Sequence, residues 1–178
     1  MSPRRQELLK LLTDNFIVYP SSFDESQVPS ELNPIEHVQY SAKMKALDIK
    51  SKYPDDIIIG ADTVVSIDEH ILGKPSDINN AKQMLKLLSG RTHQVYTGYA
   101  IINGDKLITE YASTDVKFRE LTDDIINKYI STKEPMDKAG AYAIQGKGCI
   151  LVESICGCYF NVVGFPVQKI SVELEELG

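Results

Sequence analysis

One carboxylate stands inside an apolar stretch of the chain. The segment Ile57–Val65 reads IIIGADTVV, and Asp62 is its only charged residue. A carboxylate in such surroundings is costly unless it is paired, hydrogen-bonded or bound to a metal ion. The β-branched run before it is typical of a buried parallel strand, and α/β folds bind ligands where such strands end. Asp62 is therefore a candidate for chemistry; the alternative is that it caps a turn.

Two adjacent arginines near the amino terminus could bind an anion. Arg4 and Arg5 follow Ser2-Pro3, which suits the N-cap and first position of a helix. Leucines at helical spacing predict that this helix runs from about Pro3 to about Leu12. Its free N–H groups and two guanidinium groups would suit a phosphate. The alternative is that both arginines are only solvated.

Two further segments carry residues that could contact a ligand. The segment Pro135–Gly148 is rich in glycine and carries two lysines, so its backbone could approach a ligand closely. It has neither the Walker spacing nor the dinucleotide fingerprint, so alone it assigns no ligand. Asp24 and Glu25 lie in the polar loop Ser21–Pro29, where they could hold a divalent ion or form a solvated turn.

Composition limits the classes of protein that fit. The chain has 178 residues, of which 43% are hydrophobic and 25% charged, as expected for one domain with a real core. Its net charge of −6 argues against general binding to nucleic acid polymers or anionic membranes, but not against a small polyanion held by local cations. No apolar run approaches the ~20 residues of a membrane span. Three cysteines without framework spacing predict reduced thiols and a cytoplasmic location.

The elements that must position these residues alternate between helices and strands. Apolar periodicity predicts helices from Asn33 to about Leu47, over 78–88, after Thr122 and after Pro166. Strands are predicted at 16–19, around 57–65, over 94–102, over 107–118 and at 149–152, with hairpin turns at Asp68-Glu69 and Asn103-Gly104. This order predicts an α/β fold with a mixed sheet.

Several separated motifs resemble, in the same order, those of the Maf family of nucleoside triphosphate pyrophosphatases. They are Ser2-Pro3-Arg4-Arg5 with Glu7-Leu8-Leu9, Gly60-Ala61-Asp62-Thr63-Val64-Val65, Gly73-Lys74-Pro75, Leu88-Ser89-Gly90-Arg91 with His93, Tyr96-Thr97-Gly98, Asp137-Lys138-Ala139-Gly140-Ala141-Tyr142, Ile144-Gln145-Gly146, and Asn161-Val162-Val163-Gly164 with Pro166.

The resemblance implies one Maf-like domain over residues 1–178. Its fold would be a mixed, twisted sheet flanked by helices, in two lobes with a central nucleotide cleft, similar to inosine triphosphatases. Family members usually have a short apolar strand ending in Ala-Ser before the Ser-Pro-Arg-Arg run. Here Met1 directly precedes Ser2, so that strand is expected to be missing.

The resemblance also implies an activity and a set of site residues. The enzyme would hydrolyse a nucleoside triphosphate to the monophosphate and diphosphate with a divalent metal ion, Mg²⁺ or Mn²⁺, and would form a homodimer. A subgroup acting on dTTP and UTP carries Arg, Thr and Gln at three specificity positions, matched here by Arg4, Thr63 and Gln145. By resemblance Asp62 is the catalytic base or a metal ligand, and Glu25 is the second carboxylate near the metal. The remaining substrate-binding residues by resemblance are Ser2, Arg5, Lys45, Lys74 and Lys138.

Two other functions fit the same residues. One is a nucleotide-binding regulator of cell division and septum formation with little catalysis. The other is a phosphatase that releases orthophosphate from the γ position. Measurable turnover separates an enzyme from the regulator, and the identity of the product separates the two enzymes.

Overall fold

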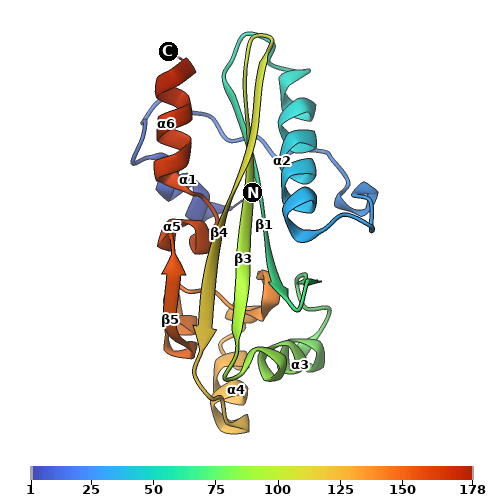
Figure 1. Cartoon of the computed structure of the whole chain (residues 1–178), viewed down its shortest axis with the longest axis vertical. Helices are drawn as coiled ribbons and strands as arrows, with labels where there is room; N and C mark the ends of the chain where they lie inside the picture. The colour runs from blue at the N-terminus through green and yellow to red at the C-terminus, as the bar shows by residue number, and fades with distance from the viewer. Residues whose placement is uncertain (1, 178) are drawn as a thin grey trace. The chain divides into compact units, whose positions relative to one another are not determined.

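The computed structural model describes residues 2–177 (Figure 1). The chain divides into two compact units, each assembled from separate segments. Unit 1 comprises Met1–Thr63, Tyr96–Ala112 and Gly164–Gly178, and unit 2 comprises Val64–Val95 and Ser113–Val163. A five-stranded antiparallel sheet has the order β2-β1-β3-β4-β5. The predicted α/β fold with a helix-flanked sheet is confirmed, but the sheet is antiparallel and not mixed as predicted; the two lobes and the central nucleotide cleft stay predictions.

Three long strands form the middle of the sheet and two short ones its edges. The strands are β1 (Ile58–Ile67), β2 (His70–Leu72), β3 (Thr92–Asn103), β4 (Lys106–Phe118) and β5 (Val152–Gly157). The pairing of β1 with β2 is antiparallel and matches Val65 with Leu72, and the pairing of β4 with β5 is antiparallel from Thr114 opposite Gly157 to Phe118 opposite Val152. Short turns therefore join both β1 to β2 and β3 to β4.

The prediction that Asp62 follows the end of a parallel strand is wrong. β1 begins at Ile58 and continues beyond Asp62 to Ile67, and it pairs antiparallel with β2. At its start, Ile58 and Gly60 are buried while Ile59 is only half-buried, which is the alternation of a strand with two different faces. Asp62 therefore projects from the middle of a strand, whose neighbours hold its backbone in place.

Unit 1 contains the helices α1 (Pro3–Leu9), α2 (Pro34–Lys50) and α6 (Val167–Leu177) and the short 3₁₀ helix η1 (Glu25–Gln27). Asn33 begins α2 with a capping box: its side chain accepts from the N–H of Glu36, and the Glu36 carboxylate accepts from the N–H of Asn33. α1 ends three residues before the predicted Leu12. Residues 16–19, predicted as a strand, form no regular element. Within residues 2–177 no helix combines the length and apolar character needed to cross a bilayer.

Unit 2 contains α3 (Ile78–Leu88), α4 (Asp123–Ile130) and α5 (Tyr159–Val163), with 3₁₀ helices η2 (Glu134–Asp137), η3 (Ala139–Ala141) and η4 (Gly146–Leu151). Asp77 and Thr122 cap α3 and α4 through their side chains, and Thr122 does so at the predicted position. The strand predicted at 149–152 is wrong, because η4 extends to Leu151 and β5 begins only at Val152. Aliphatic and aromatic side chains from α3, α4 and the strands form one buried cluster in this unit.

Candidate functional site

Three predicted site residues meet in unit 1. The ammonium nitrogen of Lys45, on α2, lies 2.7 Å from Oδ1 of Asp62 on β1 and 2.6 Å from Oε1 of Glu25 in η1. The side chains of Lys45 and Asp62 are 17% and 13% exposed, whereas that of Glu25 is 61% exposed. Partial burial of the Lys45–Asp62 pair strengthens its electrostatic interaction relative to a surface pair. The Lys45 ammonium group therefore contacts two carboxylates from separate chain segments.

Close packing of α2 on β1 places Lys45 beside Asp62. Gly60 has no side chain, and a Cβ there would lie 2.5 Å from the Ala42 carbonyl oxygen and 2.9 Å from the Ala46 nitrogen. Both alanines are fully buried. The backbones of α2 and β1 therefore lie close together at Gly60. Lys45 directly precedes Ala46 and Asp62 follows Gly60 by two residues, so this close packing brings their side chains into contact. Figure 1 shows α2 running alongside β1.

A second glycine allows the same helix, α2, to pack closely on the neighbouring strand β3. At Gly98, on β3, a Cβ would lie 2.3 Å from the Val38 carbonyl oxygen. Val38 is fully buried on α2, one turn before Ala42. Two close backbone contacts along α2 therefore fix both its distance from the strands and its rotation about its own axis.

The loop that carries Glu25 is fastened to the same helix. The carboxylate of Asp48, on α2, accepts hydrogen bonds from the Ser22 N–H at 2.6 Å, the Ser22 hydroxyl at 2.7 Å and the Ser21 hydroxyl at 3.0 Å. The bonds from Ser22, with smaller contributions from Ser21 and Lys52, lower the pKa of Asp48 to about 2. Asp48 therefore anchors the loop three residues before Glu25, a role that the sequence did not predict.

Arg5 binds atoms of its own chain. Its Nε donates to the Gly164 carbonyl at 2.8 Å, its Nη1 to the Ala61 carbonyl at 2.8 Å, and its Nη2 to Thr63 Oγ1 at 2.8 Å. Burial lowers the pKa of the Arg5 guanidinium from its usual value, the nearby Asp62 carboxylate opposes that shift, and Arg4 adds to it. Arg5 thus holds the backbone and side chain on both sides of Asp62. The predicted phosphate contact would use the N–H groups that remain.

The hydroxyl of Thr63 lies in a short polar chain. Besides the bond from Arg5, Thr63 Oγ1 lies 2.9 Å from Thr97 Oγ1 on β3, and either hydroxyl can be the donor. Thr97 is fully buried. The sequence placed Thr97 in a motif without giving it a role. A fully buried hydroxyl in a strand is the signal that would have singled it out, and burial is not visible in the sequence.

Ser2 and Arg4 lie at the start of α1, on either side of Pro3. Ser2 is the N-cap as predicted, but its side chain makes no capping hydrogen bond. Arg4 is half-buried, and within residues 2–177 its guanidinium donates no hydrogen bond. Neither side chain therefore makes, within residues 2–177, the kind of hydrogen bonds that the Arg5 guanidinium makes to its own chain.

In unit 2, two of the predicted lysines lie on segments joined by their backbones. The Gly140 N–H donates to the Gly73 carbonyl at 3.1 Å, which brings the segments of Lys74 and Lys138 side by side. Lys74 is exposed, and Lys138 is paired with the neighbouring Asp137 carboxylate. Gly140 has φ +65°, and a Cβ there would lie 2.9 Å from Val65. A glycine is needed for this close contact.

Gln145 completes the predicted set. It occupies the N-cap position of η4 in an extended conformation, with φ −81° and ψ 164°, and its side chain makes no capping hydrogen bond. Its side chain is half-buried. The Gln145 amide therefore does not serve as the cap of η4.

The residues fit a divalent ion only with help from a ligand. Within residues 2–177 no group of three or more His, Cys, Asp or Glu side chains is arranged to hold a metal ion. Glu25 and Asp62 nevertheless converge on one cation, the Lys45 ammonium. Mg²⁺ is commonly held by one or two carboxylates together with substrate phosphates and water. Two converging carboxylates therefore match what Mg²⁺ or Mn²⁺ requires from the protein.

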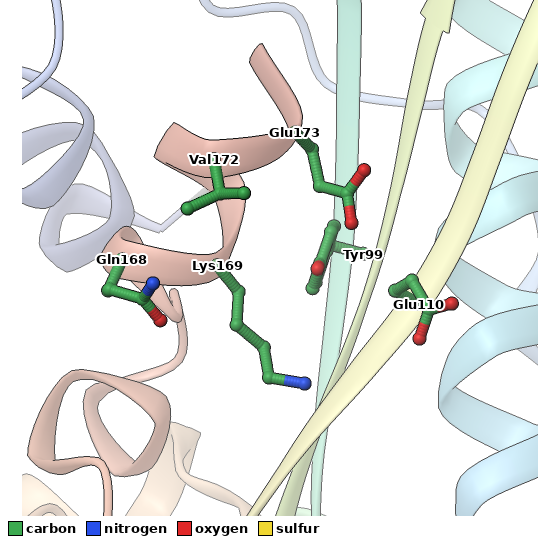
Figure 2. Close-up of a pocket in the computed structure, with 6 residues that line it drawn as sticks. All are labelled: Tyr99, Glu110, Gln168, Lys169, Val172 and Glu173. Carbon is green, nitrogen blue, oxygen red and sulfur yellow. The ribbon is translucent and has the colours of Figure 1, made fainter. Parts of the chain in front are cut away.

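A separate hollow of about 190 Å³ in unit 1 contains none of the predicted residues (Figure 2). It is lined by Tyr99, Glu110, Gln168, Lys169, Val172 and Glu173. Lys169 Nζ donates to the Tyr111 carbonyl at 3.1 Å. Burial and the charges of Glu173 and Glu110 raise the pKa of Tyr99. The phenol of Tyr99 therefore stays neutral. Because two carboxylates and one lysine line the hollow, it offers little positive charge to a phosphate.

Comparison with known proteins agrees with these observations. The model of the family described as Maf-like protein matches residues 1–177. A Clostridium botulinum protein (strain Eklund 17B / Type B) named dTTP/UTP pyrophosphatase is 54% identical over 178 residues, which cover 98% of this chain and 95% of the relative. A Pyrococcus furiosus protein of the same name is 54% identical over 177 residues, with 99% and 92% covered. A Bacillus cytotoxicus protein, also of that name, is 47% identical over 175 residues, with 98% and 91% covered. With a match of this extent, the chain belongs to the Maf family.

Proposed function

We propose that this protein hydrolyses dTTP and UTP to the monophosphate and diphosphate with the help of a divalent metal ion. The observation that carries the proposal is the meeting of Asp62, Lys45 and Glu25 beside Thr63. Relatives named dTTP/UTP pyrophosphatase, about half identical over nearly the full chain, support the choice of substrate.

The cationic residues suit a triphosphate. Attack at the α-phosphorus moves negative charge onto the departing diphosphate, and fixed positive charge lowers the barrier when it lies where that charge develops. Arg4, Lys74 and Lys138 are the cations that we assign to the phosphates, with Ser2 as a neutral donor. Arg5 acts mainly by holding Ala61 and Thr63, and its remaining N–H groups could reach a phosphate oxygen.

Asp62 is the residue that we assign to the attacking water. A carboxylate fixed in the middle of a strand can orient a water molecule and accept its proton. Glu25 and Asp62 would hold the metal ion, which when bound supplies a more acidic water and neutralises phosphate charge. We also assign Lys45, whose ammonium group contacts both carboxylates, to a phosphate oxygen of the substrate.

Three residues are assigned to base and sugar selection. The Gln145 amide has both a donor and an acceptor, which match the acceptor and donor of the imide edge of uracil or thymine. Arg4 and Thr63 are the other two members of the specificity set. Thr63 is held by Arg5 and Thr97, so its methyl group and hydroxyl have a fixed orientation.

Product analysis tests the proposal. The purified protein is incubated with dTTP, UTP, CTP, ATP and GTP, each with and without Mg²⁺ or Mn²⁺, and the products are separated by ion exchange. We expect monophosphate and diphosphate from dTTP and UTP only when metal is present. Orthophosphate as the product would indicate a phosphatase, and tight binding without product would indicate a regulator.

A matched pair of variants ties the activity to the site. Asp62→Asn removes the carboxylate that Lys45 contacts, whereas Asp68→Asn removes a carboxylate that pairs with Arg91 at the same 2.7 Å on an exposed turn. Loss of turnover in the first variant alone supports the assignment. Equal loss in both would contradict it.

A further inference from the structure

Gln145 occupies a position that normally requires a different side chain. The N-cap of a helix is preferentially Ser, Thr, Asp or Asn, because a short polar side chain can accept from the free N–H groups of the first turn. Gln145 stands at the N-cap of η4 and makes no such bond. The N–H groups at the start of η4 must therefore find another acceptor, since buried or half-buried donors are costly to leave unpaired.

Glu134 supplies that acceptor from outside the helix. Its Oε2 accepts from the Lys147 N–H at 3.0 Å, and its Oε1 accepts from the Gly148 N–H at 3.0 Å. These two N–H groups are the ones that an N-cap side chain would bind. Gly146 has φ +69°, and a Cβ there would lie 2.7 Å from Glu134 Oε2, so the glycine makes room for the carboxylate.

Tyr129 links the same carboxylate to the segment before Gln145. Its hydroxyl donates to Glu134 Oε1 at 2.9 Å and accepts from the Ala143 N–H at 3.2 Å. Tyr129 is almost fully buried on α4. Partial burial would raise the pKa of Glu134, but the hydrogen bonds from Lys147, Tyr129 and Gly148 outweigh it, so the pKa is lowered and the group stays ionised at neutral pH.

We propose that Glu134 is a positioning residue for pyrimidine selectivity, because it caps η4 in place of Gln145 and leaves the Gln145 amide free to bind the base. The inference rests on the proposed function of Gln145. The Tyr129–Glu134 pair fixes the backbone two residues before Gln145 and the two N–H groups that follow Gly146. Hydrogen bonds thus hold the backbone on both sides of Gln145, and none of them uses the polar atoms of the Gln145 side chain.

Glu134→Gln tests the proposal with little change in size. A glutamine has one acceptor oxygen where the carboxylate has two, so at least one of the two backbone N–H groups loses its partner. We expect the ratio of kcat/KM for UTP to that for CTP to fall about tenfold, as for the loss of one hydrogen bond to a charged group, mainly through a higher KM for UTP. Amide hydrogen exchange at Lys147 and Gly148 should accelerate in the same variant.

A control separates positioning from a general loss of stability. Asp77→Ala removes the N-cap of α3 in the same unit, where the carboxylate accepts from the Asn80 N–H at 2.8 Å; within residues 2–177 the Asp77 side chain makes no hydrogen bond to η4. We expect this variant to lower thermal stability while leaving the UTP to CTP ratio unchanged. An equal fall of both rates in Glu134→Gln, with an unchanged ratio, would overturn the proposal.

A double variant tests whether Glu134 acts through Gln145. Gln145→Ala should lower the UTP to CTP ratio by itself, and adding Glu134→Gln should lower it no further, because the side chain that Glu134 positions is gone. A further fall in the double variant would contradict the proposal. If the native protein hydrolyses neither nucleotide, the same ratio is obtained from the dissociation constants of UTP and CTP by calorimetry, so failure of the proposed hydrolysis leaves this test intact.

Discussion

Nζ of Lys45 lies 2.7 Å from Oδ1 of Asp62, and the same nitrogen lies 2.6 Å from Oε1 of Glu25. The contact joins the middle of α2 to the middle of β1. Lys45 and Asp62 are both mostly shielded from solvent, so their ion pair differs from the exposed surface pairs that contribute little to stability. The geometry instead brings two carboxylates and one ammonium group together at the point where we propose that the metal ion and the attacking water bind.

The first prediction concerns Asp62. Asp62→Asn keeps the size of the side chain but removes its charge and its ability to accept a proton. If Asp62 is the base, turnover of UTP should fall about 10²–10⁴-fold, the usual contribution of a general base. Initial rates and a thermal unfolding curve measure activity and folding separately. A folded variant with a near-normal rate would remove Asp62 from the mechanism.

The second prediction concerns Gly60. A methyl group at this position would lie 2.5 Å from the Ala42 carbonyl oxygen, so Gly60→Ala must push α2 away from β1. Overpacking of this kind costs about 1–3 kcal/mol in free energy of unfolding. The shift would also separate Lys45 from Asp62 and lower kcat. Chemical denaturation and steady-state kinetics measure the two effects.

Gly73→Ala is the control for that substitution. Gly73 has an ordinary φ, and a Cβ there would meet no atom within 4 Å. The free energy of unfolding should therefore stay within about 0.5 kcal/mol of the native value, as for most surface substitutions. If both variants were equally stable, close packing at Gly60 would not be what holds α2 in place.

The third prediction contrasts the two arginines. Arg5→Lys keeps the charge but cannot donate at once to Gly164, Ala61 and Thr63, so we expect a loss of about 1–3 kcal/mol in free energy of unfolding. Arg4→Lys should leave that free energy unchanged, because Arg4 makes no hydrogen bond with residues 2–177. It should instead raise KM for UTP. Urea titration and kinetics on both variants decide the matter, and the reverse pattern would exchange the two roles.

The fourth prediction concerns pH and His93. This residue is fully buried, its Nε2 lies 2.7 Å from the Tyr142 hydroxyl, and its ring packs edge-on against Phe118. Burial lowers the pKa of His93 from 6.5 to about 4, against the opposing charge of Asp115. Between these two values the unfolded chain binds more protons than the folded one, so stability must fall as the pH falls from about 6.5 to about 4.

The size of that effect is measurable. Lowering the pH from 7 to 5 should cost roughly 2 kcal/mol in free energy of unfolding from His93 alone. His93→Gln should be less stable at pH 7 but should lose most of this slope, as urea titrations at several pH values would reveal. His70→Gln, which alters an exposed histidine in β2, should keep the slope. A slope that survives His93→Gln would assign it to other groups.

The sequence predicted the helices better than the strands. The helices α2 and α4 begin at the predicted caps, because Asn33 and Thr122 act through contacts within one turn. The segments 16–19 and 149–152 were wrongly predicted as strands. The apolar residues of 149–152 favour a strand locally, but Gly146 packs against Glu134, the Gly148 N–H donates to the same carboxylate, and the 3₁₀ helix that begins at Gly146 continues through Leu151. Such long-range contacts override local preference.

The site residues were predicted by type, but their partners were not. The charge of Asp62 in an apolar stretch marked it as a candidate, and the structure pairs it with Lys45, seventeen residues earlier in the chain. The contacts of Arg5 with Gly164 and of Glu134 with Lys147 depend on how distant segments fold together. Asp48, Thr97 and Glu134 were missed because ordinary polar residues acquire their roles only through those contacts.

The bond from Arg5 to the Gly164 carbonyl has a consequence for how the protein is made. It joins residues 159 positions apart, and unit 1 is completed by Gly164–Gly178. During translation a chain growing from its amino end cannot form this bond until residue 164 has emerged from the ribosome. Contacts of such high sequence separation slow folding, because a long loop must close before they form. The arginine that supports Asp62 and Thr63 must therefore wait for almost the whole chain, and a nascent chain that stops short of residue 164 leaves this guanidinium without one of its three acceptors.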